Sequence, residues 1–175
     1  MQVLIPIHSV TSENTFFTEK KRNVIMDGNF VKILYSTEHF EMNGLHLRIS
    51  LESSRNPGSN LTPAFEQSGL CSYKPPKFVE LFEPTIAENL KQIEMLCKIE
   101  RDIIHHYMSL HSPHKNASYN LKSQLLSGTF RFSVENCVTG GFTVVGTRRH
   151  YALKISGIWE TNFNVGITVK FILID

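Results

Sequence analysis

The chain has 175 residues, enough for one domain with its own hydrophobic core and no need of disulfide or metal staples. Hydrophobic residues make up 41% of the sequence and charged residues 19%, a composition that excludes an intrinsically disordered protein. The formal net charge of +2 is mildly basic, which is compatible with a polyanionic partner but does not require one.

The cysteines and the N-terminal residues indicate the cellular compartment. Cys71, Cys97 and Cys137 are odd in number and not closely spaced, which argues against a disulfide scaffold or a zinc ribbon and favours reduced intracellular thiols. MQVLIPIHSV at the start lacks the basic and long apolar regions of a secretory signal. No apolar run approaches the roughly 20 residues that cross a bilayer. We therefore expect an intracellular protein that is not secreted and has no membrane partner.

The first third of the chain predicts strands separated by polar segments. Residues 3–10 favour a short edge strand, and residues 11–22 favour a loop. Residues 23–36 favour a strand that Asp27 and Gly28 break as a hairpin turn or a bulge.

A turn at Asn43 and Gly44 precedes a half-buried strand, LHLRISLE, over 45–52, in which leucine and isoleucine alternate with polar residues. Residues 52–84 form a long connection rich in Ser, Pro, Asn and Gly, and such loops are usually functional or partly disordered. Residues 77–82 favour a short strand inside it.

The clearest helix is predicted over 85–110. Thr85 and Glu88 have the spacing of a capping box, and Pro113 ends the helical pattern. Apolar residues at helical spacing predict its core-facing stripe: Ile86, Leu90, Ile93, Leu96, Cys97, Ile103, Ile104 and Tyr107.

Three further strands are predicted over 128–134, 150–160 and 164–174, the last two joined as a hairpin through 161–164. The chain thus reads as a single domain, 1–175, of mostly β (α+β) class. Five strands with one amphipathic helix between the early and the late strands fit a five-stranded OB-like barrel, an architecture whose sheet face binds oligonucleotides.

Each of the five longer strands carries a basic residue that alternates with its apolar residues: Lys32, Arg48, Arg131, Lys154 and Lys170. The face of Lys32 is ambiguous, because both faces of its strand hold apolar residues. In one curved sheet these cations would line the outer surface as a track for phosphates. The alternative is that these positions are basic only because they face solvent.

Other candidates lie near this track. Arg148 and Arg149 precede the strand over 150–160, and Lys74 and Lys77 lie in the long loop. The candidates for stacking on bases are Tyr35, Tyr73 and Tyr151, and each stack contributes about 1–3 kcal/mol. The sequence therefore predicts a protein that binds single-stranded nucleic acid without catalysis, cofactor or metal.

Two stretches, MDGNFVKILYSTEHFEMNGLHLRISL and HYALKISGIWETNFNVGITVKFILI, resemble the single-stranded-DNA-binding proteins of large eukaryotic DNA viruses. Those proteins are similar to OB-fold single-strand binders of tailed bacteriophages. The resemblance implies that the chain coats single-stranded DNA during replication or recombination in the host cytoplasm or nucleus, with replication proteins as partners. Such proteins often recruit partners through an acidic tail, which the ending Ile174-Asp175 does not match.

Three alternatives remain open. A viral structural or assembly protein would self-associate into a homo-oligomer through the apolar stretch VKFILI, acting as an edge strand. A small metalloenzyme would use His105, His106, His111 and His114, although histidines near a helix C-terminus are commonly solvated. A nucleophilic cysteine would best be Cys137, since Cys97 lies on the helix stripe. Trp159 is expected in the core, with base stacking as its alternative role.

Overall fold

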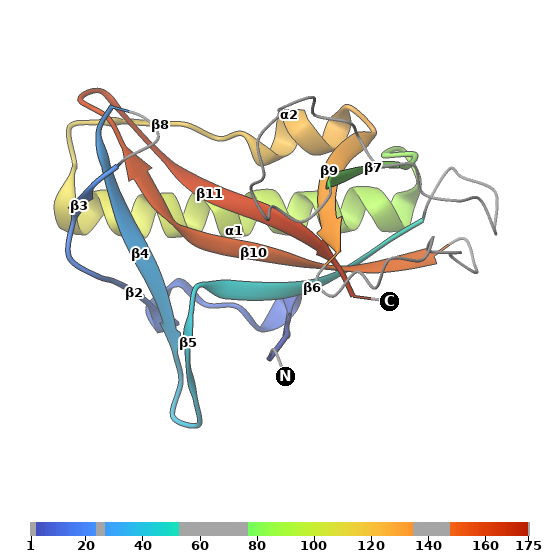
Figure 1. Cartoon of the computed structure of the whole chain (residues 1–175), viewed down its shortest axis with the longest axis horizontal. Helices are drawn as coiled ribbons and strands as arrows, with labels where there is room; N and C mark the ends of the chain where they lie inside the picture. The colour runs from blue at the N-terminus through green and yellow to red at the C-terminus, as the bar shows by residue number, and fades with distance from the viewer. Residues whose placement is uncertain (1–2, 24–26, 53–76, 135–147, 175) are drawn as a thin grey trace, which may run out of the picture.

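The computed structural model describes residues 3–23, 27–52, 77–134 and 148–174, and a large mixed sheet with a long helix along one side dominates it (Figure 1). The strands are β1 (Ile5–Pro6), β2 (Thr15–Phe17), β3 (Lys21–Arg22), β4 (Asn29–Ser36), β5 (Glu41–Asn43), β6 (Leu45–Glu52), β7 (Lys77–Leu81), β8 (Asn116–Ala117), β9 (Thr129–Val134), β10 (Arg148–Glu160) and β11 (Asn164–Leu173). The helices are α1 (Ala87–His111), α2 (Leu121–Leu126) and the 3-10 turns η1 (Ile7–Ser9) and η2 (Ser12–Asn14).

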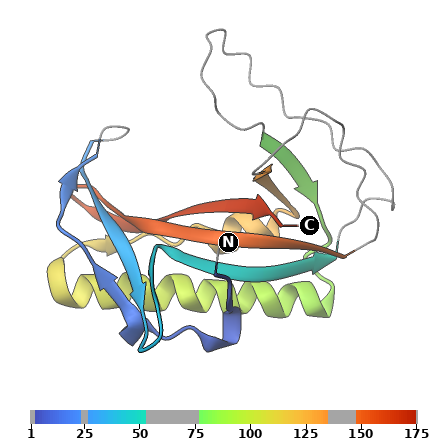
Figure 2. The same cartoon turned by 60° about the horizontal axis from the view of Figure 1, so that its bottom comes forward.

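The sheet follows the order β1-β6-β10-β11-β9-β7, with β4 paired to the far half of β10 and carrying β2, β3 and β5. α1 runs along one side of the sheet in both ribbon views (Figures 1 and 2). The mostly β class and the main helix between early and late strands are confirmed. The closed five-stranded barrel is not confirmed, because among the described residues the sheet is open, ending at β1 and β7. None of the helices in the described ranges is long and apolar enough to span a membrane.

Element boundaries differ from expectation mainly near the N-terminus. The strand predicted over 3–10 shortens to β1, and the loop predicted over 11–22 contains β2 and β3, which pair with β4. The short α2 was not predicted, although its Leu121 and Leu125 are buried. The strand inside the long connection and the hairpin between β10 and β11 are confirmed.

The start of α1 is fixed by a buried asparagine and not by the predicted capping box. The hydroxyl of Thr85 donates to Glu83 at 2.8 Å, and the N-cap position makes no side-chain hydrogen bond. The amide of Asn89, fully buried, donates to the carbonyl oxygens of Glu83 and Glu52 and accepts from the Glu52 N–H at 2.9 Å. This exchange ties the first turn of α1 to the end of β6.

The apolar stripe of α1 is largely confirmed, since Ile93, Leu96, Ile103, Ile104 and Tyr107 are buried. Leu90 is exposed and Cys97 is only partly buried.

A buried carboxylate on α1, that of Glu100, was not anticipated. Glu100 accepts the N–H groups of Asn120 at 2.9 Å and of Leu121 at 3.3 Å, so it holds the first turn of α2. Burial raises the pKa of Glu100, and the two backbone hydrogen bonds oppose that rise.

A bulge in β10 divides the sheet into two wings. Up to Ile155, β10 pairs with β6, and from Gly157 it pairs with β4, so Ser156 has no partner residue on either side. Gly44, with φ of +78°, lies where β5 passes into β6, and its N–H donates to Ile33 of β4 at 2.7 Å. At the bulge, β6 stops pairing with β10 and β4 begins to pair with it. We call this place, where β4 and β6 separate, the fork.

The bulge also changes which side chains face the helix. Before it, Leu153 and Ile155 are buried against the α1 side; after it, Ile158 and Glu160 take that side. Trp159 therefore lies on the opposite face, next to β4.

The close approach of β4 to β10 leads to a stability prediction. A Cβ at Gly157 would lie 2.3 Å from the Val31 carbonyl oxygen and 2.6 Å from the Phe30 ring, so Gly157→Ala should destabilise the fold by about 3 kcal/mol. Chemical denaturation measures the free energy of unfolding. The neighbouring Ser156→Ala is the control and should change it by no more than about 0.5 kcal/mol. An equally small effect of Gly157→Ala would contradict the packing of the two strands.

Candidate functional site: the open face of the sheet

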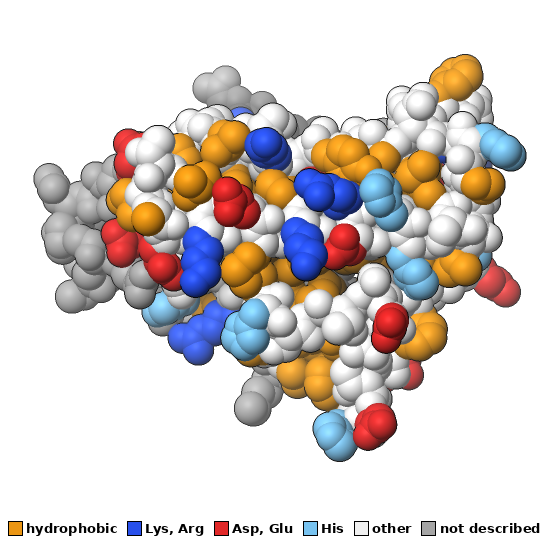
Figure 3. Space-filling model, turned by 180° about the vertical axis from the view of Figure 1, so that it is seen from behind, with side chains coloured by type: hydrophobic (Ala, Val, Ile, Leu, Met, Phe, Trp, Pro, Cys, Tyr) orange, Lys and Arg blue, Asp and Glu red, His pale blue; other side chains and the backbone are white. Residues whose placement is uncertain are grey.

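The face of the sheet turned away from α1 is the candidate site, and we call it the open face. Strand register assigns to it the residues Lys21, Phe30, Lys32, His46, Lys154, Trp159, Thr168 and Lys170. Figure 1 looks onto this face, with α1 behind it. The opposite side of the molecule has a different surface, because lysines alternate with acidic side chains over the helix (Figure 3).

A row of basic side chains crosses the middle of the open face. Lys154 of β10 lies directly opposite Lys170 of β11, and on its other side it lies opposite His46 of β6, whose side chain is only 8% exposed. Like charges placed opposite each other destabilise a sheet.

Lys32 joins this row from β4, where it is exposed and opposite Gly157, so its ambiguous position is settled in favour of the open face. Within the described part of the chain, no carboxylate forms an ion pair with Lys32 or Lys154. Ion pairing therefore does not account for the position of these two lysines.

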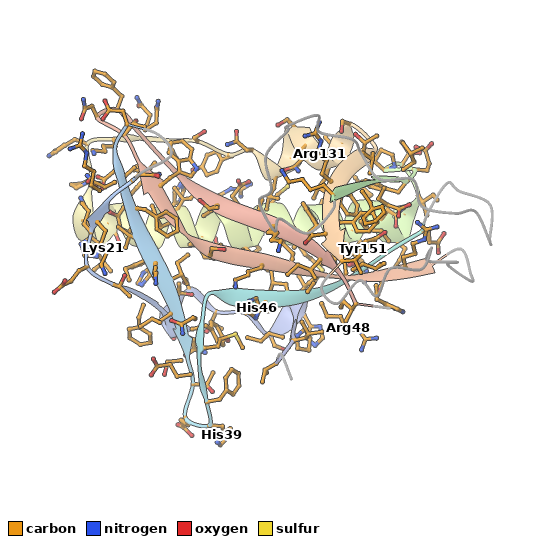
Figure 4. All side chains as sticks on the ribbon, viewed as in Figure 1. Lys21, His39, His46, Arg48, Arg131 and Tyr151 are labelled. Carbon is orange, nitrogen blue, oxygen red and sulfur yellow. The ribbon has the colours of Figure 1, made fainter. Side chains whose placement is uncertain are left out.

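The basic surface continues across both ends of the sheet. Register places Arg131 of β9 and Lys77 of β7 on the same face, where they line a cavity of about 350 Å³ together with Lys170 and Gln124. At the other end, Lys21 of β3 is exposed and lies opposite Phe30. Figure 4 shows Lys21 and Arg131 toward opposite ends of the sheet.

Arg48 follows the predicted alternation but lies at the margin. It is exposed on β6, and its side chain points toward the edge of the sheet (Figure 4). There it lines a cleft of about 440 Å³ with His8 of η1 and Gln92 of α1. It is therefore a peripheral member of the basic surface.

Three predicted site residues lie in the core, so their assignment was wrong. Tyr35 is 2% exposed and packs near Phe40. Arg149 and Tyr151 are at most 1% exposed and both bind the buried carboxylate of Glu80, Arg149 through an ion pair of 2.6 Å. The reason is register, because residues 149 and 151 share the helix side with 153 and 155.

The carboxylate of Glu80 explains how the core accepts Arg149 and Tyr151. Burial raises the pKa of Tyr151, and the Glu80 charge raises it further. Tyr151 is therefore a neutral hydrogen-bond donor and is not available to a ligand. Tyr73, Lys74, Cys137 and the side chain of Arg148 lie outside the described residues.

The sequence pattern did not predict that two aromatic rings lie side by side on the open face. Phe30 and Trp159 are directly opposite each other, and each is half-buried against a glycine. A Cβ at Gly166 would be 2.4 Å from the indole, so the Trp159 ring lies over that backbone as the Phe30 ring lies over Gly157. The predicted core position of Trp159 is wrong, while the expected hydrogen bond of its N–H is confirmed, 3.1 Å to the Ile167 carbonyl.

A buried carboxylate next to Trp159 fixes the end of β10 from the helix side. Glu160 accepts hydrogen bonds from Ser112 at 2.5 Å and Tyr107 at 3.0 Å, and pairs with Lys20 and Lys115 at 2.6 Å each. Burial alone would raise the pKa of Glu160, but the hydrogen bonds of these four side chains outweigh it and lower the pKa from 4.5 to about 2.

The histidines do not form a metal site. His105 bonds Tyr119 at 2.6 Å, while His106 and His111 pack against the ring of Phe17. Across the described ranges, no group of three His, Cys, Asp or Glu side chains is arranged to hold a metal ion.

Comparison of the chain with protein-family models found no match, and comparisons with curated proteins and with solved structures found none either. The resemblance to viral single-strand binders therefore stays a prediction from the residues quoted above.

The Glu160 cluster gives a pH prediction. Because the pKa of Glu160 is depressed in the folded state, its stabilising contribution is fully present above pH 4.5 and is lost as the pH falls toward 2. Denaturant titrations of the wild type and Glu160→Gln should show unfolding free energies that differ most above pH 4.5 and converge below it. A gap that stays constant with pH would contradict the depressed pKa.

Proposed function

We propose that the open face binds single-stranded nucleic acid, with single-stranded DNA as the ligand, and that the protein acts without catalysis. The observation that carries the proposal is that Lys32 and Lys154, which form no ion pair with a described carboxylate, lie beside two aromatic rings laid over glycines. Phosphates need cations along a track, and bases need flat apolar surfaces. Both lie on one side of one sheet here.

Each part of the ligand has a counterpart on this face. Lys32, Lys154 and Lys170 provide charge for successive phosphates, and Arg131 with Lys77 extends the track toward β7. Phe30 and Trp159 provide the stacking surfaces, each contributing about 1–3 kcal/mol per base. Stacking of this kind requires unpaired bases, so the arrangement favours a single strand over a duplex.

The biological role follows from the resemblance and not from the geometry. Coating of single-stranded DNA during viral replication or recombination is what the two quoted stretches imply. The alternative of self-assembly through VKFILI loses its basis, because β11 pairs with β10, β9 and β8 and is not an edge strand.

Binding should depend on salt and on the lysine row. In fluorescence anisotropy titrations, labelled oligo-dT should bind more tightly than duplex DNA of equal length, with affinity falling as salt rises. Lys154→Gln or Lys170→Gln should weaken binding to all sequences alike and reduce the slope of log K against log salt by about 0.7. Lys98→Gln, on the exposed side of α1, is the matched control. If the slope of log K against log salt is unchanged in both Lys154→Gln and Lys170→Gln, these lysines do not contact the nucleic acid.

The single tryptophan provides an independent signal. Because Trp159 is half-buried on the open face, base stacking should quench its fluorescence as oligo-dT is added, along the same curve as the anisotropy. Phe30→Leu should weaken binding by about 1–3 kcal/mol while the emission of the free protein persists. Anisotropy that saturates with no change in emission would place the ligand away from Trp159.

A further inference from the structure

The fork of the sheet contains a cavity of about 340 Å³ lined by β4, the end of β5 with Gly44, and β10. Its polar lining comes from four side chains, Lys32, Asn43, Lys154 and Ser156, and its aromatic wall is Phe30. This volume is at the lower end of the range of about 300–1,000 Å³ for small-ligand sites. It is large enough for one small ligand and not for a folded partner.

The cavity exists because three strands cannot pair at one point. β6 leaves β10 after Ile155, β4 joins it at Gly157, and Ser156 between them has no partner residue on either side of β10. Bulged residues of this kind recur beside binding sites, because they interrupt the ladder and redirect a side chain.

The lining has the chemistry of an anion site with an aromatic wall. Lys32 and Lys154 come from different strands and carry no ion pair with any described residue. Ser156 offers a hydroxyl, and Asn43 offers both an amide donor and an acceptor. Phe30 is held over Gly157 and is half-buried.

We propose that this cavity is a subsite for one nucleotide of the bound strand, which rests on the proposed single-strand function. The phosphate lies between Lys32 and Lys154, where Ser156 donates a hydrogen bond to it. The base stacks on Phe30, and its polar edge faces Asn43. The neighbouring base along the strand then reaches Trp159, which is opposite Phe30 in register. The subsite fixes where the strand enters the open face.

The test is a titration of the ¹⁵N-labelled full chain with thymidine 5′-monophosphate, followed by ¹H–¹⁵N correlation spectra. We expect shifts at the amides around Gly44 and Ser156. Thymidine without the phosphate and inorganic phosphate without the base should each bind at least about 10-fold more weakly, because each lacks one half of the recognition.

Three variants locate the site. Lys32→Gln and Lys154→Gln should each weaken binding of the nucleotide about 10-fold or more, since each removes a charged hydrogen-bond donor. Phe30→Leu should reduce the affinity for the nucleotide to that for inorganic phosphate. Lys98→Gln should change nothing. The spectra themselves report whether each variant is folded.

Each other outcome overturns part of the account. Shifts confined to residues away from the fork, or unchanged affinity in both lysine variants, overturn the subsite. Oligo-dT binding without nucleotide binding overturns the subsite and leaves the proposed function standing. Nucleotide binding at the fork without oligo-dT binding overturns the single-strand function, and with it the assignment of the cavity to a bound strand. Equal affinity for inorganic phosphate and the nucleotide overturns the role of Phe30.

Discussion

The arrangement of the open face depends on one interruption of strand pairing, the bulge of β10 at Ser156. Gly157 follows the bulge and lets the backbone of β4 approach to a distance that no side chain would allow. Because of this, the pairing partner of β10 changes from β6 to β4 at the bulge, and the sheet forks. Three features follow: the lysine row from strands on both wings, the two aromatic rings over glycines, and the cavity between the wings.

Buried carboxylates on the helix side complement this face. Glu80 forms an ion pair with Arg149, and Glu160 forms ion pairs with Lys20 and Lys115. Burying a charge is costly unless it is paired and hydrogen-bonded, and both sites meet that condition. The cations that these acids neutralise are therefore not those of Lys32 and Lys154, which leaves the open face with positive charge.

Alternation in the sequence predicted the positions of the cations well, because a strand with one buried face gives a reliable period of two. Lys154 and Lys170 were assigned to one face from that pattern, and register confirms it. The same pattern placed Trp159 in the core. The bulge shifts the period by one residue, and Gly157 is the one residue in the sequence that hints at it. Arg149 and Tyr151 were misplaced for the opposite reason: their polar ends suggested a surface, while Glu80, distant in sequence, made burial possible.

The barrel was predicted from the number and order of the strands and the helix. These do not determine whether the sheet closes into a barrel. Closure depends on pairing between the first and last strands of the sheet, and here β1 and β7 end it separately among the described residues. The pairing of β2 and β3 with β4 was likewise missed, since two- and three-residue strands carry no periodicity that can be read.

The most direct test of the central claim is photo-cross-linking of the whole chain to an oligonucleotide that contains 5-iododeoxyuridine, with the adducts located by mass spectrometry. Binding on the open face predicts adducts at Trp159 and Phe30. Tyr119, which is 43% exposed and bonded to His105 of α1, serves as an internal reference away from that face. Adducts at Tyr119 with none at Trp159 or Phe30 would contradict the account.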